Sequence, residues 1–288
     1  MGTASAAQWK VRRRTTGAIR GIITHILLIV LGISFLLPFV WMISTSLKPD
    51  EQLFIFPPEW IPSQFMWSNY PDALSFFPFF KYLKNTLIIC LWTLLGTTLS
   101  SAIVAYGFSR IQWPGRNFLF LILLSTMMLP YQVTMIPLFV LFKQLGWVGS
   151  FKPLIIPSFF GGAFSIFLVR QFYLTIPYEL SDAARIDGCS EFRIFWQIIL
   201  PLAKPALATV ALFTFIGGWN DFLGPLIYLN DESKFTISLG LQQFVGVYGT
   251  EWSKLMSASV VTTVPIILLF FFGQKMFIQG ISTTGLKG

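Results

Sequence analysis

The chain has 288 residues, of which 55% are hydrophobic and 11% are charged, and its net charge is +8. Soluble globular domains carry about 25% charged residues, so this composition excludes that class and indicates a membrane protein. The basic residues fall in the gaps between apolar runs and form no continuous basic face, which argues against nucleic acid as a partner.

Six apolar runs predict six membrane-spanning helices, because about 30 Å of hydrocarbon requires roughly 20 residues of helix. The runs cover approximately residues 22–47, 85–108, 117–142, 154–173, 205–229 and 256–277. Residues 1–20 form a basic tail, and residues 48–83 are predicted to be an external loop that includes one short helix. The first run is longer than the apolar region of a cleaved signal peptide, so we interpret it as a span. The predicted fold is an all-α, polytopic membrane protein with a single transmembrane domain over residues 1–288.

The distribution of lysine and arginine predicts the orientation. With the termini in the cytoplasm, thirteen of the twenty basic residues lie on the cytoplasmic side: Lys10, Arg12, Arg13, Arg14, Arg20, Arg110, Arg116, Arg170, Arg185, Arg193, Lys204, Lys275 and Lys287. Cytoplasmic loops are enriched in these residues, so both termini and the loop 177–205 are predicted to be cytoplasmic.

Proline and glycine interrupt the third, fourth and fifth predicted spans, at Pro130, Pro137, Pro157, Gly161-Gly162 and Gly217-Gly218. Broken helices expose backbone polar groups, which membranes tolerate only within protein contacts or along a water-filled path. Proline and glycine are also common in membrane helices generally. Several breaks in three successive spans favour a transporter or channel over a simple anchor.

The loop 177–205 is rich in charge and yet has apolar residues at helical spacing. A helix over 178–187 would place Leu180, Ala183, Ala184 and Asp187 on one face, and Gly188 would terminate it. A second helix, capped by Ser190 and ended by Pro201, would carry a stripe of Phe192, Phe195, Trp196 and Ile199. The pattern predicts an elbow of two short helices at the membrane surface. An amphipathic helix that only anchors the loop in lipid headgroups is the alternative, but it does not explain the small-residue face or the glycine turn.

The same residues resemble the EAA signature of bacterial ABC importer permeases. The matching positions are Asp182-Ala183-Ala184, Asp187-Gly188, Phe195, Ile198, Leu200-Pro201 and Pro205. Asp182 stands where the family usually has Glu, and Cys189 where it often has Ala. FPPEWIPS…NY, Asn85-Thr86, MMLPYQVTMIPL, FLVRQFYLTIP, WNDFLGPLIYL and the terminal GISTTGLKG are similar to the carbohydrate branch of these permeases, the MalG-like subunits.

This resemblance implies a non-catalytic permease subunit of an ATP-driven carbohydrate importer in a bacterial inner membrane. Its expected partners are a second homologous permease, two ABC ATPase subunits, an external or periplasmic solute-binding protein and membrane lipid. ATP and Mg²⁺ would be bound by the ATPases, so this chain would hold no cofactor. The residues expected to couple to the ATPase are Asp182, Ala183, Ala184, Arg185, Asp187 and Gly188.

Candidates for the substrate path surround the only acid within a predicted span. Asp221 follows Trp219 and Asn220, and an ionisable residue within a membrane is by default a functional candidate. Trp219 could stack on a sugar ring while the two polar side chains bind its hydroxyls. Alternatively, Asn220 and Asp221 cap a broken helix or pair across a subunit interface. Further polar candidates beside the break at Pro130 are Tyr131, Gln132 and Thr134.

Two other functional classes fit less well. An ion-coupled secondary transporter of a small polar solute would need internal repeats and several buried ionisable groups. An intramembrane enzyme would need a cluster of catalytic side chains, but the chain has one histidine, His25, and no phosphate-binding GxxxxGK[ST] loop. The two cysteines, Cys90 and Cys189, have no metal-site spacing, and no metal is expected.

Overall fold

The structure is a computed structural model that describes residues 3–246 and 249–285, with side chains described for 20–246 and 249–274. The chain divides into two compact units. The first comprises residues 1–73 and 250–260, and the second comprises residues 74–249 and 261–288. Lys10, Arg12, Arg13, Arg14, Lys275 and Lys287 lie outside the described side chains.

The first unit contains α1 (Thr3–Ser46), the short 3-10 helix η1 (Asp50–Gln52), the start of α2 (Asn69–Ser75) and the start of α14 (Trp252–Gly285). The predicted basic tail is therefore helical from Thr3 and continuous with the first span. Asn69 ties the unit together, because its side-chain amide donates to the carbonyls of Ser46 and Lys48 at 3.0 and 3.1 Å. Lys48 is buried, with its ammonium 4.1 Å from the centre of the Trp41 ring.

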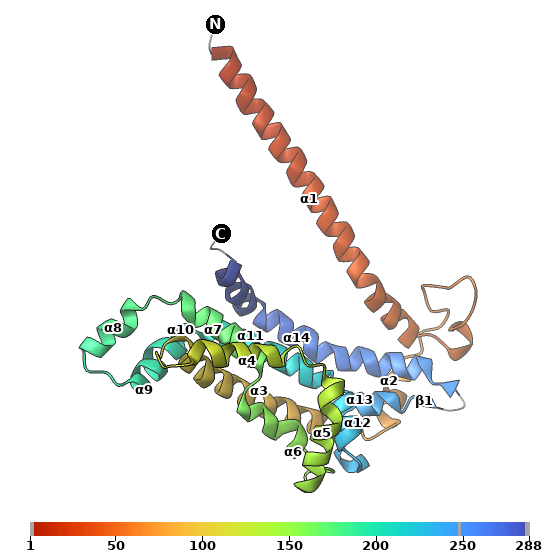
Figure 1. Cartoon of the computed structure of the whole chain (residues 1–288). Helices are drawn as coiled ribbons and strands as arrows, with labels where there is room; N and C mark the ends of the chain where they lie inside the picture. The colour runs from red at the N-terminus through yellow and green to blue at the C-terminus, as the bar shows by residue number, and fades with distance from the viewer. Residues whose placement is uncertain (1–2, 247–248, 286–288) are drawn as a thin grey trace. The chain divides into compact units, whose positions relative to one another are not determined.

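The second unit is arranged around α3 (Phe79–Ser109), which packs against helices from most of the unit (Figure 1). The other helices are α4 (Arg116–Thr126), α5 (Tyr131–Gln144), α6 (Lys152–Ile155), α7 (Ala163–Thr175), α8 (Glu179–Ile186), α9 (Glu191–Ile194), α10 (Leu200–Leu202), α11 (Lys204–Trp219), α12 (Leu223–Tyr228) and α13 (Ile237–Gln242). Shorter 3-10 helices are η2 (Ile156–Phe160) and η4 (Glu232–Lys234), a π-helix spans Phe195–Ile199, and the strands β1 (Val245–Gly246) and β2 (Gly249–Thr250) form a small ladder.

Small residues on α3 explain why its neighbours approach so closely. Ser101, Ala102 and Ala105 are buried along the helix, and small side chains let membrane helices pack backbone to backbone. A Cβ at Gly96 would collide with Ser158 and Phe159 of η2. The packing of α3 against η2, α7 and α11 therefore forms the core of this unit.

The number of long apolar helices agrees in part with the prediction. Four described helical segments are long and apolar enough to cross a membrane: 20–46, 79–109, 152–175 and 252–274. Two bent pairs raise the possible number to six, namely 116–126 with 131–144, bent by 96°, and 191–202 with 204–219, bent by 74°. The first bend falls at Pro130, which lacks the N–H that a continuous helix would need.

Some predicted boundaries were wrong. The second span begins at Phe79 and not at Asn85, within the predicted loop 48–83, because Phe79 and Tyr82 are buried while Lys81 and Lys84 face outward. That loop also contains two short helical segments, η1 and α2, where one was predicted. The fifth helix stops at Trp219 and does not run to Leu229.

Candidate functional site

The loop between α7 and α11 folds as an elbow, here defined as residues 177–202. Its first helix, α8, ends where Gly188 adopts a left-handed conformation with φ of 78°. The amide of Gly188 donates to the Arg185 carbonyl at 3.0 Å, and that of Cys189 to the Ala184 carbonyl at 2.9 Å. This is the Schellman arrangement that satisfies the last carbonyls of a helix. The predicted glycine turn is therefore present.

The second arm begins at Ser190, whose hydroxyl accepts from the Arg193 amide at 3.4 Å. The predicted apolar stripe of this arm is divided between two faces. Phe195 and Ile199 are buried in the core of the second unit, whereas Phe192 and Trp196 are exposed and stack on each other with their ring centres 6.3 Å apart. Because Phe195–Ile199 is a π-helix, its residues turn through smaller angles than those of the predicted α-helix. Pro201 also does not end the arm, which continues to Leu202.

The two alanines of the first arm also face different ways. Ala184 is 6% exposed and packs into the core of the second unit with Phe195, while Ala183 is exposed. The prediction that Ala184 shares one face with Leu180, Ala183 and Asp187 is therefore wrong, because Ala184 alone is buried. Ser181 and Ala184, three residues apart, make the inner face, and the outer face carries Leu180, Ala183 and Asp187.

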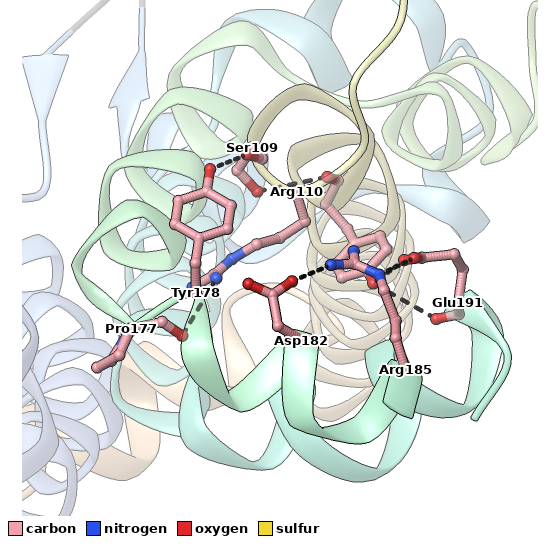
Figure 2. A network of polar contacts seen from close by, with 8 residues as sticks. Ser109, Arg110, Pro177, Tyr178, Asp182, Arg185 and Glu191 are labelled. Carbon is pink, nitrogen blue, oxygen red and sulfur yellow. Dashed lines mark hydrogen bonds and ion pairs between the residues drawn. The ribbon is translucent and has the colours of Figure 1, made fainter. Parts of the chain in front are cut away.

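An ion-pair network holds the two arms of the elbow together (Figure 2). The Arg185 guanidinium contacts Asp182 at 2.7 Å and Glu191, across the turn, at 2.8 Å. These hydrogen bonds raise the pKa of Arg185, with the bond to Glu191 as the largest contribution. The Tyr106 hydroxyl of α3 donates to the second carboxylate oxygen of Glu191 at 2.7 Å. The angle between the arms is thus fixed by side chains as well as by Gly188.

Arg110, at the end of α3, is a functional candidate that the sequence analysis did not single out. It is 2% exposed, and its guanidinium donates to the carbonyls of Tyr173 and Ile176, both at 2.5 Å (neighbours shown in Figure 2). It also lies 4.5 Å from the centre of the Tyr178 ring. Burial lowers the pKa of Arg110 from its ordinary value. The sequence offered only an arginine directly after an apolar run, which was used to predict the orientation of the chain.

The outward side of the elbow exposes large apolar side chains together with charge. Ile186 is 87% and Phe192 is 74% exposed, and Leu180 and Trp196 are exposed as well. Charged Asp182 and Asp187 lie beside them. Exposed apolar groups rimmed by polar ones are typical of a protein-interaction surface. We call these six side chains, together with the exposed Ala183, the outer face of the elbow.

The second predicted site is a helix break at residues 220–222. Trp219 is 4% exposed, stacks on Phe215 at 5.6 Å and donates from its ring nitrogen to the Thr262 carbonyl at 3.2 Å. The side-chain amide of Asn220 donates to the Ile216 carbonyl at 2.9 Å, and the carboxylate of Asp221 accepts from the Gly224 amide at 3.0 Å. These bonds favour the interpretation in which Asn220 and Asp221 cap a broken helix.

Asp221 also lines a pocket of about 360 Å³ between α5, α6, η2 and α12. Tyr131 and Tyr228 contribute the other polar groups of its wall, and Leu154 and Phe142 are among its apolar members. The structure thus brings Asp221 and Tyr131 to one cavity. Gln132 and Thr134 are not part of that wall, and the Thr134 hydroxyl donates to the Tyr131 carbonyl at 3.0 Å.

Within the part of the chain that the structure describes, no group of three His, Cys, Asp or Glu side chains is placed to hold a metal ion. Cys90 is buried and Cys189 is partly buried, and both are free thiols.

Relatives of this chain are transport permeases. It is 35% identical over 261 residues to the arabinooligosaccharides transport system permease protein AraQ of Bacillus subtilis, a match that covers 90% of this chain and 92% of the relative. The sn-glycerol-3-phosphate transport system permease protein UgpE of Yersinia pestis is 33% identical over 269 residues, with 90% and 95% covered. The diacetylchitobiose uptake system permease protein NgcG of Streptomyces coelicolor is 30% identical over 263 residues, with 90% and 87% covered.

The fold is similar to that of a solved transporter structure. A chain from the crystal structure of a bacterial ABC transporter involved in the import of the acidic polysaccharide alginate superposes with a TM-score of 0.78 and 25% identity. The match covers 91% of this chain and 98% of that one. Residues 96–283 match the family model described as binding-protein-dependent transport system inner membrane component, a stretch that includes the elbow, Arg110 and the pocket. The chain therefore belongs to the family of inner membrane components of binding-protein-dependent transport systems.

Proposed function

We propose that this chain is a permease subunit of an ATP-driven ABC importer of carbohydrates, and that the elbow is where the ATPase acts on it. The observation that carries this proposal is the outer face of the elbow, which offers four large apolar side chains and two acids outside the core of the second unit. The relatives named above are permease proteins of transport systems for arabinooligosaccharides, diacetylchitobiose and sn-glycerol-3-phosphate.

The proposed assembly contains a second homologous permease, two ATPase subunits that bind ATP and Mg²⁺, and an external solute-binding protein. Support for a binding protein comes from a structural neighbour described as an alginate ABC transporter in complex with a pentasaccharide-bound periplasmic protein. The termini and the elbow would be cytoplasmic, in agreement with the excess of basic residues on that side. In this arrangement the chain performs no chemistry itself.

The cysteine pattern of the chain allows a direct test of docking. Ala183 is exposed on the outer face, and Cys189 is the one partly exposed native thiol among the described residues. In a Cys189→Ser background, Ala183→Cys labelled with a benzophenone maleimide should cross-link to an ATPase subunit in the purified complex on illumination, since the benzophenone needs no cysteine on the partner. Ala184→Cys, which the permease buries, is the matched control and should give no product. Absence of a cross-link from Ala183→Cys, Ile186→Cys and Phe192→Cys alike would refute docking at the elbow.

Substrate class is tested by ATP hydrolysis of the reconstituted complex with its binding protein. Arabinotriose, diacetylchitobiose, an alginate oligosaccharide and sn-glycerol 3-phosphate are suitable probes, since they represent the substrates named for the relatives. At least one of the saccharides should stimulate hydrolysis. Stimulation by glycerol 3-phosphate alone would contradict a carbohydrate importer.

We further propose that the pocket between α5, α6, η2 and α12 lies along the substrate path. Tyr131 would offer its hydroxyl to a passing saccharide, and Asp221 would shape the wall by holding the first turn of α12. Gln132, which is exposed, and Thr134, which is partly buried, remain path candidates on α5. Trp219 would support this wall from within the helix packing.

A further inference from the structure

We propose that α3 is the strut that carries movement of the elbow into the membrane-spanning part, and that Arg110 and Tyr106 are the positioning residues that fix the elbow to it. The proposal rests on the proposed function, since it assigns how force applied at the outer face would be transmitted. It concerns two residues outside the elbow, neither of which the sequence pattern connects with coupling.

The first attachment is at the start of the elbow. The guanidinium of Arg110 donates to the carbonyls of Tyr173 and Ile176, which end α7, and it reaches the Pro177 carbonyl at 3.5 Å. The last carbonyls of a helix are its negative end, so a buried cation is favourable there. Tyr178 completes the attachment, because its hydroxyl donates to the Ser109 carbonyl at 2.7 Å.

The second attachment is beyond the turn. Tyr106 donates its hydroxyl to Glu191, the first residue of α9, and its ring packs edge to face on Phe195 with the centres 5.1 Å apart. Glu191 in turn holds Arg185 of α8. Tyr106 of α3 thus contacts the second arm directly and is linked to the first arm through the ion pair of Glu191 with Arg185.

The two attachments lie on one face of α3. Tyr106 and Arg110 are four residues apart, which places them one helical turn from each other on the same side. The chain on both sides of α8 is therefore bound to a segment of α3 about 6 Å long. A push on the elbow cannot be absorbed by a flexible connection, because the residues on either side of α8 are held to the same rigid helix.

The far end of α3 is attached in a similar way. The side-chain amide of Asn85 donates to the carbonyls of Ser233 and Phe235 at 3.0 and 2.9 Å, and the Thr86 hydroxyl accepts from the Ile237 amide at 3.0 Å. From Asn85 to Arg110 the helix spans roughly 38 Å, enough to cross the hydrocarbon layer. Figure 1 shows α8 and α9 at one end of the second unit and α12 and α13 at the other, with α3 between them. The strut thus joins the elbow to the segment 233–237.

Arg170 provides a matched control. It also donates to a carbonyl near a helix end, from its Nε to Phe108 at 3.1 Å, and it also lies over an aromatic ring, Phe120, at 4.0 Å. It joins α7 to the end of α3, but it makes none of the described bonds to the elbow. If the role of Arg110 were only to stabilise helix ends, Arg110→Met and Arg170→Met should have similar effects.

The test measures whether the elbow moves together with α3. Spin labels are attached to Ile103→Cys on α3 and Glu179→Cys on α8, both exposed positions outside the outer face, in a background with Cys90→Ser and Cys189→Ser. Distances are measured by pulsed EPR in the purified complex without nucleotide and after trapping with ADP and vanadate. The parent should give the same distance in both states, within about 2 Å. Tyr106→Phe and Arg110→Met should broaden or shift the distribution of distances between the two labels, at least in the trapped state. Arg170→Met should leave this distribution unchanged.

A second readout separates positioning from folding. For complexes of equal amount and thermal stability, the stimulation of ATP hydrolysis by the binding protein should fall at least threefold in Arg110→Met and in Tyr106→Phe. Arg110→Lys, which keeps the cation and can still reach one or two carbonyls, should recover part of it. Tyr106→Phe removes only a hydroxyl that donates to Glu191, so it remains informative if Arg110→Met does not assemble.

The outcomes distinguish this proposal from the proposed function. The role of α3 as a strut would be overturned if the parent elbow changed its distance from α3 on trapping. It would also be overturned if the variants kept the parental distances and the parental stimulation of ATP hydrolysis. In either case the Ala183→Cys cross-link to the ATPase would still support docking at the elbow. Failure of every cross-link from the outer face would overturn docking itself, whatever the distances show.

Discussion

Gly188 provides the sharpest test of the elbow, because its backbone conformation is one that residues with a Cβ avoid. With φ of 78° it sits in the left-handed region, and a Cβ added there would meet no atom within 4 Å. The cost of Gly188→Leu is therefore conformational and not steric, about 1–2 kcal/mol. Such a penalty lowers the population of the observed elbow relative to that of a rearranged turn by roughly 5–30-fold.

Rearrangement of the turn would break the two bonds that close α8, from the amides of Gly188 and Cys189. It would also move Glu191 away from Arg185, so the outer face would lose its shape. We expect Gly188→Leu to insert normally, to retain basal ATP hydrolysis by the complex, and to lose most of its uptake and its stimulation by the binding protein.

Gly146→Leu is the matched control. Gly146 also has a positive φ, 66°, and a Cβ added there would likewise meet no atom within 4 Å, but it follows α5 and is distant along the chain from the elbow. The two variants therefore carry similar backbone strain. The assay compares uptake and binding-protein-stimulated ATP hydrolysis in proteoliposomes at equal complex content. Equal losses in both variants, or full activity in Gly188→Leu, would refute the assignment of the elbow to coupling.

Two further predictions concern orientation and the helix break. In a Cys189→Ser background, Glu179→Cys, an exposed position of α8 outside the outer face, should react with a membrane-impermeant maleimide only in inside-out vesicles. Phe56→Cys, which is 91% exposed, should react only in right-side-out vesicles; the reverse pattern would overturn the predicted orientation. Asp221→Asn keeps a capping acceptor and should leave uptake within about twofold of the parent, whereas Asp221→Ala should destabilise the first turn of α12 by about 1 kcal/mol in thermal unfolding. A large loss of uptake in a stable Asp221→Asn complex would instead indicate that the carboxylate contacts the substrate.

The sequence was sufficient for properties that follow from local pattern. Apolar runs between charged segments predicted a helical membrane protein, and the structure has four long apolar helices and two bent pairs among its described residues. Gly188 and Ser190 predicted the turn and the cap of the elbow, because a left-handed residue and a capping hydroxyl are local requirements. The resemblance of the elbow to the EAA signature pointed to the permease family to which the chain belongs.

Which face of a helix meets which neighbour was decided only by the tertiary structure. Ala183 and Ala184 look alike in sequence, yet one is exposed and the other is buried in the core of the second unit. The π-helix at Phe195–Ile199 changes the angular positions that an α-helical wheel assumes, and so divides Phe192 and Trp196 from Phe195 and Ile199. The role of Arg110 depends on carbonyls more than sixty residues away in the chain, and local pattern contains no information about such partners. Periodicity specifies that an elbow forms, but only packing determines which of its side chains remain free for a partner and which are bound to α3.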